Sequence, residues 1–383
     1  MITTGDYAIT RSAAILAENA SSLVIKGNTL EHIGGNGIFL SNSVSNVSIT
    51  ENRFSFLGTS GVLIVGRTGR AMMDGRDGEA MVAAGGEDNG VRLPKHNVVS
   101  HNVFSDYGIW DKQSAAFHKA VAPGNTFAYN VVFNCSRHGV NFQDSMGGEG
   151  LVHHNLFFNL NRETTDTAAL NSWGRRVYVF SDSDADPSAP RLVPEPESFN
   201  RWRNNLVLNR NYWGVRDGNG NCLRCDDGAS WFNMSGNVCY ATSSAMEFNG
   251  GSQVYTHGNL FVQGGWTLCA APPGAGGGSH DTYIDSPFMW RSICGDNKCL
   301  PLWESNNATH VTSAGMCKNQ AGMPWDLPHT CKPSIMRSDF NTLVVNSTGA
   351  ATVLPDYSDG FCSLNLSEWR ARTHGDEHTR CET

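Results

Sequence analysis

A short motif, Asn-x-hydrophobic, recurs along the chain and constrains the fold more than any other feature of the sequence. The repeated asparagines are Asn28, Asn52, Asn102, Asn130, Asn155, Asn205, Asn237 and Asn259. Several of the intervals between them are 22 to 28 residues, and the longer intervals hold insertions rich in Gly, Pro or acidic residues. Self-similarity at a period of this length is typical of a solenoid.

The segments between the motifs have the pattern of short strands. Leu23–Ile25, Val47–Ile49 and Gly61–Val65 are brief apolar or alternating runs without a helical period. One coil cannot bury its apolar face alone, but a stack of coils can. We therefore predict an all-β fold, a right-handed parallel β-helix. Each repeated Asn is expected to occupy a left-handed turn and to hydrogen-bond its counterparts in the neighbouring coils.

The whole chain, 1–383, is predicted to be a single β-helix domain. Regular coils are expected over 1–268, with insertions at about 67–95 and 181–199. From Cys269 onward the repeat fades into a Gly- and Pro-rich run and then a Cys-rich stretch. We expect 269–383 to form Cys-rich loops and the final coils.

Charge and hydropathy exclude two classes of partner. The formal net charge is -8, whereas a sequence-independent grip on phosphate backbones requires clustered Lys and Arg. Nucleic acid is therefore not an expected partner. No run approaches the roughly 20 apolar residues that span a bilayer, so no membrane segment is predicted. The sequence does not indicate an oligomeric state.

The cysteines predict an oxidising compartment. Of the 11 cysteines, Cys135 stands alone and the other ten lie between Cys222 and Cys381. Their spacing favours disulfides over a zinc site, with Cys135 as a buried unpaired thiol. Sequons for N-glycosylation stand at Asn19, Asn46, Asn134, Asn233, Asn307, Asn346 and Asn365. We predict a secreted, extracellular glycoprotein, although the N-terminal residues do not have the pattern of a signal peptide.

Segments outside the repeat carry a resemblance to a known superfamily. They are Gly108–Ser114, Arg137–Asp144, Arg162–Asp166, Asn171–Arg175 and Asp226–Gly228. These segments resemble the pectate-lyase-like superfamily of parallel β-helices, and within it a group of secreted proteins without settled chemistry. The resemblance implies a polysaccharide-acting site or the remnant of one, and a chain that extends further at both ends. The sequence departs from that group at Thr167, where the others carry His, and at Gly174, where they carry Asp.

One face of the β-helix is expected to hold the site, because equivalent side chains of successive coils form rows about 4.8 Å apart. Anchoring on the repeated Asn places Asp111–Gln113, Val140–Asp144, Leu170–Trp173, Arg224–Asp227 and Glu247–Asn249 on adjacent rungs. The predicted substrate-binding residues are Lys112, Gln113, Asn141, Asp144, Asn171, Trp173 and Arg175. Trp173, with Trp110 or Trp213, is expected to stack on a sugar ring.

Three carboxylates are the predicted catalytic groups: Asp166, Asp226 and Asp227. The like charges of Asp226 and Asp227 favour protonation of one of them, as a general acid requires. Asp166 is the candidate for the second carboxylate, and carboxylates on nearby rungs have the separations used in glycoside hydrolysis. The alternative interpretation of each Asp is a turn residue hydrogen-bonded to its own backbone. We predict a glycoside hydrolase acting on an extracellular polysaccharide.

Two other functions fit the sequence. A polysaccharide lyase would use Lys112 and Arg175 as base and as positive charge on a uronate carboxylate. A non-catalytic glycan-binding or structural protein, such as a cell-wall or filament component, would use the stiff rod and its long lateral surface.

Four histidines, His118, His138, His153 and His154, are candidate metal ligands, but no metal site is predicted. His153 and His154 precede a repeated Asn, and strand alternation is expected to direct their rings oppositely. No nucleotide-binding or serine-hydrolase motif is present in the sequence, and no cofactor is predicted.

Overall fold

The computed structural model describes a large part of the coil-forming sequence. The described residues are 9–66, 93–143, 148–164, 167–173, 199–209, 221–226, 229, 232–240, 242, 246–248 and 254–262. Short strands are also described at 310–311, 334–339, 342–344 and 380–382.

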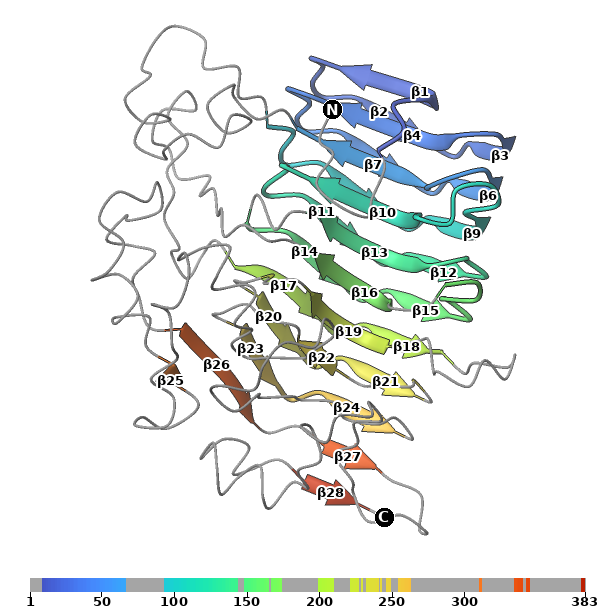
Figure 1. The fold of residues 1–383 in the computed structure, drawn as a ribbon. Coiled ribbons are helices and arrows are strands. Elements are labelled where there is room, and N and C mark those ends of the chain that lie inside the picture. Colours follow the sequence, from blue (N-terminus) through green and yellow to red (C-terminus); the bar gives the residue numbers. More distant parts are fainter. Residues whose placement is uncertain are drawn as a thin grey trace, which may run out of the picture.

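The described strands form three parallel sheets that run along one stack of coils (Figure 1). The first sheet contains β1 (Ala13–Glu18), β4 (Asn36–Ser41), β7 (Val62–Val65), β10 (Ala115–Ala120), β13 (His138–Gln143), β16 (Ala168–Trp173), β19 (Asn221–Asp226) and β22 (Met246–Phe248). The second contains β2 (Val24–Lys26), β5 (Ser48–Thr50), β8 (Val98–Ser100), β11 (Thr126–Ala128), β14 (Leu151–His153), β17 (Asn200–Arg203), β20 (Phe232–Ser235), β23 (Val254–His257), β26 (Ser334–Asp339) and β25 (His310–Val311). The third contains β3 (Thr29–Ile33), β6 (Arg53–Leu57), β9 (Val103–Tyr107), β12 (Val131–Phe133), β15 (Leu156–Phe158), β18 (Leu206–Leu208), β21 (Val238–Tyr240), β24 (Leu260–Val262), β27 (Thr342–Val344) and β28 (Arg380–Glu382).

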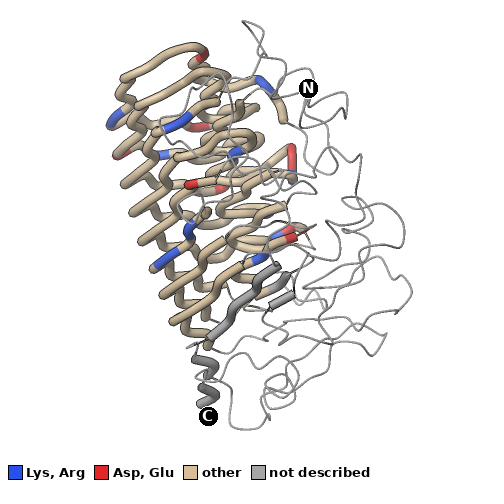
Figure 2. The backbone as a smooth tube through the Cα atoms, turned by 90° about the vertical axis from the view of Figure 1, so that its left-hand side faces the viewer, with Lys and Arg blue, Asp and Glu red and all other residues tan. Residues whose placement is uncertain are grey.

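Each coil contributes one strand to each sheet in turn, so the prediction of an all-β right-handed parallel β-helix is confirmed. Among the described strands, the pairing of β25 with β26 is the antiparallel exception. The described residues include no helix long and apolar enough to cross a membrane. Lys, Arg, Asp and Glu are scattered along the described coils (Figure 2).

The repeated asparagines form a continuous hydrogen-bonded ladder between the second and third sheets, as predicted. Asn52 is representative: its backbone N and its Nδ2 both donate to Asn102 Oδ1, at 2.9 and 3.0 Å. Its Nδ2 also donates to Ile25 O of the preceding coil at 2.8 Å. We call this set, from Asn28 to Asn259, the Asn ladder. It satisfies polar backbone groups that the sharp corner would otherwise leave without partners.

The predicted conformation of the ladder residues was wrong. The left-handed residue is the one before each ladder Asn, and these residues are Gly27, Glu51, His101, Tyr129, His154, Asn204, Gly236 and Gly258. A single left-handed residue turns the chain at this corner. Because the turn is completed one residue earlier, each Asn can align its side chain along the stack.

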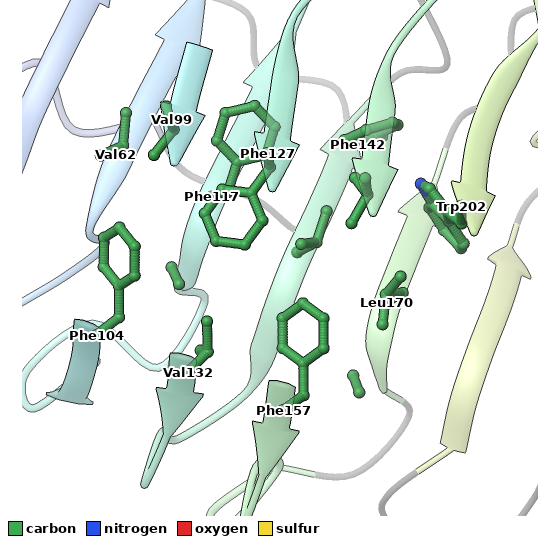
Figure 3. Close-up of a cluster of buried hydrophobic side chains, with 14 of the residues drawn as sticks. Val62, Val99, Phe104, Phe117, Phe127, Val132, Phe142, Phe157, Leu170 and Trp202 are labelled. Carbon is green, nitrogen blue, oxygen red and sulfur yellow. The ribbon is translucent and has the colours of Figure 1, made fainter. Parts of the chain in front are cut away.

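The lumen is filled by apolar side chains whose sizes match across each coil (Figure 3). A Cβ added to Gly61 would lie 2.7 Å from Phe104 Cδ1, and a Cβ added to Gly139 would lie 2.6 Å from Phe157 Cδ1. Coils with a larger first-sheet residue carry a smaller partner in the third sheet. The register gives the matched pairs Gly37 and Phe54, Gly61 and Phe104, Ala116 and Val132, Gly139 and Phe157, and Ala169 and Val207.

A disulfide takes the same two positions in the next coil. Cys222 on β19 and Cys239 on β21 are bonded, with a sequence separation of 17. Cys135 is a buried free thiol, as predicted, and Cys225 is a second one that the sequence did not single out. The side chains of the other cysteines lie outside the described part of the chain.

The lumen also contains one lysine. Lys119 pairs in register with Ile64 and Phe142 on the inward row of the first sheet. Its Nζ donates to Asn200 Oδ1 at 3.0 Å and lies 4.2 Å from the centroid of the Phe142 ring. Burial lowers the pKa of Lys119 to about 7, against the opposing charge of Glu149.

Candidate functional site

The outward face of the first sheet changes from apolar to polar along the stack. Phe39 and Leu63 belong to an apolar cluster outside the main core. The positions that continue their row are His118, Asn141, Asn171 and Arg224. The next outward row continues from Val65 and Ala120 to Gln143, Trp173 and Asp226. We call these seven residues, His118, Asn141, Gln143, Asn171, Trp173, Arg224 and Asp226, the polar face.

Hydrogen bonds link the first row of the polar face. Asn171 Nδ2 donates to Asn141 Oδ1 at 2.9 Å, and Asn141 Nδ2 lies 3.3 Å from His118 Nδ1. An amide nitrogen can only donate, so His118 Nδ1 accepts and the neutral ring carries its proton on Nε2. Burial lowers the pKa of His118 to about 3, and the neighbouring Gln143 side chain acts in the opposite direction. The His118 ring is therefore uncharged at neutral pH.

The last strand of the polar face, β19, carries an ion pair. Arg224 Nη2 lies 3.1 Å from Asp226 Oδ2, and both side chains are buried. Because a guanidinium stays protonated in proteins, Arg224 compensates the charge of the Asp226 carboxylate at this buried position.

Two amides of the polar face have hydrogen-bonding capacity that no described residue uses. Gln143 Oε1 and Nε2 are both buried and have no partner at hydrogen-bonding distance and angle, although the side chain is close enough to His118 to affect the pKa of that ring. Asn171 Oδ1 is also buried without a hydrogen-bond partner. A buried polar atom without a partner costs about 1–3 kcal/mol. Such atoms in a native structure require an explanation, and one explanation is a bound ligand or water.

The polar face is buried, and its least buried members are Trp173 and Asp226 on two neighbouring strands. Asn141, Gln143 and Arg224 are exposed by 3% or less, whereas Trp173 and Asp226 retain 7% and 8%. Trp173 is the last residue of β16, and Asp226 is the last residue of β19. A ligand that reaches the row would therefore approach from this end of the two strands.

Of the five predicted rungs, four were correct and one was wrong, and the fourth correct rung is β22, where Glu247 pairs with Arg224. Asn141, Asn171 and Arg224 pair in register, and so do Trp173 and Asp226. The rung above Asn141 is β10, not Asp111–Gln113. The reason is that Gly108–Ser114 forms a longer turn in this coil, and Lys112 and Gln113 lie in that turn.

The contacts of Lys112 among the described residues are with its own turn and with Glu163, and none of them involves the polar face. Lys112 Nζ lies 2.7 Å from Glu163 Oε2 and donates to Ile109 O at 2.9 Å. The Gln113 side-chain oxygen is buried without a hydrogen-bond partner among the described residues. The predicted residues Asp144, Asp166, Arg175 and Asp227 lie outside the described residues, and their roles stay predictions.

The histidine pair differs from the prediction. His153 Nδ1 and His154 Nδ1 are 2.8 Å apart, so the two rings meet instead of pointing in opposite directions. His154 is in the left-handed conformation, with φ 54°, and strand alternation therefore ends at His153. No group of three or more metal-ligating side chains occurs among the described residues.

Sequence reasoning did not include His118, Gln143 or Arg224 among the site residues. Gln143 and Arg224 lie on the predicted rungs of β13 and β19. His118 lies on β10, the strand that follows the longer turn. The available signal was strand alternation, because Gln143 and Arg224 stand two positions from Asn141 and Asp226 respectively and share their face.

Comparisons with known proteins give one distant likeness. No protein-family model matches the sequence, and no curated protein matches it. A solved structure described as a glycoside hydrolase is similar over 66% of this chain and 38% of that chain, with 14% sequence identity and a TM-score of 0.44. A likeness this distant carries no argument about function, so membership of the superfamily stays a prediction and the function must be argued from the polar face.

Proposed function

We propose that the protein is a carbohydrate-active protein, and specifically a glycoside hydrolase whose substrate binds at the polar face. The observation that carries the proposal is the unused hydrogen-bonding capacity of Gln143 and Asn171 beside the Arg224–Asp226 ion pair. Sugar hydroxyls both donate and accept hydrogen bonds, so they complement amides that have free donors and acceptors on the same surface.

In this proposal Asp226 acts as the general base. It would take a proton from the water that attacks the anomeric carbon, while a protonated carboxyl group donates to the leaving oxygen. Asp227 and Asp166 are the predicted candidates for that acid. Trp173, next to Asp226 in register on the neighbouring strand, would stack on the apolar face of the sugar ring.

The lyase is the weaker alternative. It relied on Lys112 and Arg175, and Lys112 is engaged with Glu163 in the turn before β10. Arg224 is engaged with Asp226, which leaves the described polar face without an uncompensated positive charge for a uronate. Of the non-catalytic alternatives, only the structural role is favoured by the burial of the polar face, because a groove that binds a long polymer would be more exposed.

Secretion belongs to the same proposal. The Cys222–Cys239 disulfide agrees with an oxidising compartment, where such bonds persist. Glycosylation at the sequons follows only if the chain passes through a secretory pathway that adds glycans.

A substrate screen tests the function directly. Neutral and uronic polysaccharides are incubated with the protein, and both reducing ends and the absorbance of unsaturated products are followed. We expect new reducing ends without unsaturation. Unsaturated products would indicate a lyase, binding without products would indicate a glycan-binding module, and neither would favour a structural role.

The site is tested with the Asp226→Asn variant, which should reduce kcat by about 10²- to 10⁴-fold. This substitution also leaves Arg224 buried without its counter-charge, which is itself destabilising. The double variant Arg224→Gln with Asp226→Asn removes both charges, and it should be equally inactive while retaining the circular dichroism of the wild type. Asp106→Asn, on the third sheet, is the matched control. Full activity of the double variant would exclude the polar face as the catalytic site.

A further inference from the structure

Trp110 is the most exposed large apolar side chain among the described residues. Its exposed fraction is 77%, and Ile109 beside it is 38% exposed. Most tryptophans in folded proteins are largely buried, because the indole is the largest apolar side chain. The position of Trp110 outside the packed coils therefore calls for an explanation in terms of a ligand.

The turn that carries Trp110 is held firmly against the preceding coil. Trp110 N and Asp111 N both donate to Gly58 O, at 2.9 and 3.0 Å, and Gly108 N donates to Thr59 O at 2.9 Å. Gly58 also makes room for the indole, since a Cβ there would lie 2.7 Å from Trp110 Cδ1. The ring is thus presented from a fixed backbone, which lowers the entropy lost when a ligand stacks on it.

Lys112, two residues after Trp110 on the same turn, forms an ion pair with Glu163 of the turn that precedes β16, and its Nζ donates to Ile109 O next to Trp110. Lys112 Nζ lies 2.7 Å from Glu163 Oε2, and these side chains are 39% and 51% exposed. The ammonium has three N–H donors, of which Ile109 O and Glu163 use two. One donor and several carboxylate lone pairs therefore face solvent at the turn that carries Trp110.

We propose that Trp110, Lys112 and Glu163 form a sugar-binding subsite that takes one pyranose ring of a glycan chain. The C–H face of the pyranose stacks on the indole, one hydroxyl accepts a hydrogen bond from Lys112, and another donates to Glu163. The inference rests on the proposed function only for the class of ligand. The turn precedes β10 and therefore lies at the amino ends of the first-sheet strands, at the opposite edge from Trp173 and Asp226.

A protein partner fits this surface less well. A stable protein interface buries about 800 Å² on each side and has an apolar centre. At this turn a single aromatic ring is bordered by exposed charged groups, and the combination of flat apolar surface with adjacent donors and acceptors matches a sugar.

The test is native gel electrophoresis of the full chain in gels that contain galactomannan, xyloglucan, arabinogalactan or polygalacturonate. We expect at least one of these polymers to retard the wild type, and Trp110→Ala to weaken the retardation constant about tenfold or more. Trp110→Phe, which keeps a smaller ring, should retain part of the retardation. Tyr240→Ala is the matched control, because Tyr240 is 41% exposed on the third sheet, and it should behave as the wild type.

Two outcomes would overturn the subsite: retardation of Trp110→Ala equal to that of the wild type, or no retardation of the wild type in any of the four gels. The proposed hydrolase is judged separately, by reducing ends released from the same polymers. If the protein releases reducing ends but Trp110→Ala is retarded like the wild type, the subsite alone is overturned. If Trp110→Ala loses retardation but no reducing ends are released by the wild type, the hydrolase alone is overturned.

Discussion

Substitution of one interior residue of the Asn ladder should destabilise the stack far more than substitution of the end residue. Asn130 accepts hydrogen bonds from Asn102 N and Asn102 Nδ2 at 2.9 and 3.1 Å. Its Nδ2 donates to Val99 O at 3.0 Å and to Asn155 Oδ1 at 3.1 Å. Asn130→Ala removes all four of these bonds.

The magnitude follows from the groups that are left behind. Asn102 Nδ2 keeps Ile49 O and Ser100 O, and Asn155 Oδ1 keeps the backbone N–H of residue 130. The amide N–H of Asn102 and the carbonyl of Val99 lose these partners in the interior. At about 1–3 kcal/mol for each buried polar group, Asn130→Ala should cost about 2–6 kcal/mol.

Asn28→Ala is the matched control at the first position of the ladder. Asn28 is exposed, and its side-chain amide donates to O of the exposed Lys26 and to Asn52 Oδ1, which keeps the backbone N–H of residue 28 as a donor. Its removal should change the unfolding free energy by about 0.5 kcal/mol or less.

Urea unfolding followed by tryptophan fluorescence measures both variants. Because solenoids can unfold by parts, hydrogen exchange around Val99 and Asn102 should report the loss locally as well. If Asn130→Ala and Asn28→Ala were equally destabilising, the ladder would not stabilise the stack through its buried hydrogen bonds.

Three other predictions follow from the lumen. The pKa of Lys119 is about 7 in the folded chain, below its ordinary value of 10.5, so the unfolded chain binds more protons between these values. The unfolding free energy should therefore rise with pH from about 7 to 10, by up to about 1.4 kcal/mol per pH unit, and Lys119→Met should remove this slope in urea titrations at several pH values. Replacing Cys222 and Cys239 together by Ala should lower the unfolding free energy by about 3 kcal/mol, as expected for a closed loop of this length; an unchanged urea midpoint would contradict this. Gly139→Ala should cost about 1–3 kcal/mol through overpacking, and adding Phe157→Val should recover part of that loss in a double-mutant cycle, whereas simple additivity would show that the two sites are independent.

The sequence was sufficient to predict the architecture because the same motif recurs in every coil. The Asn motif marks the same corner in every coil, and the strand that follows each motif is short and apolar. The register failed in the coil of Asn102, because the polar segment Asp111–Gln113 was taken for the strand, whereas it belongs to the turn and β10 begins only at Ala115. In the coil of Asn155 the polar residues stand on the strand itself, and that rung was placed correctly.

The polar face was predicted in outline but not in its contacts. Asn141, Asn171, Trp173 and Asp226 were placed on one face by anchoring each coil on the repeated Asn and following it to its next strand. The Arg224–Asp226 ion pair was not predicted, because it depends on two side chains on one face of β19 meeting at a buried position. Lys119 could not have been predicted as buried, because its partner Asn200 lies 81 residues away in the sequence.

The disulfide in the lumen has a consequence for how the stack comes apart. Each coil of a solenoid contacts only its neighbours, so unravelling starts at an end and advances one coil at a time. Cys222 and Cys239 join opposite walls of a single coil, and that coil cannot open while the bond is intact. It is therefore a barrier to propagation: fraying that begins among the C-terminal coils is arrested there, and the coils that carry Asn141 and Asn171 keep their register. Reduction removes the barrier and lets disorder at one end spread into the polar face.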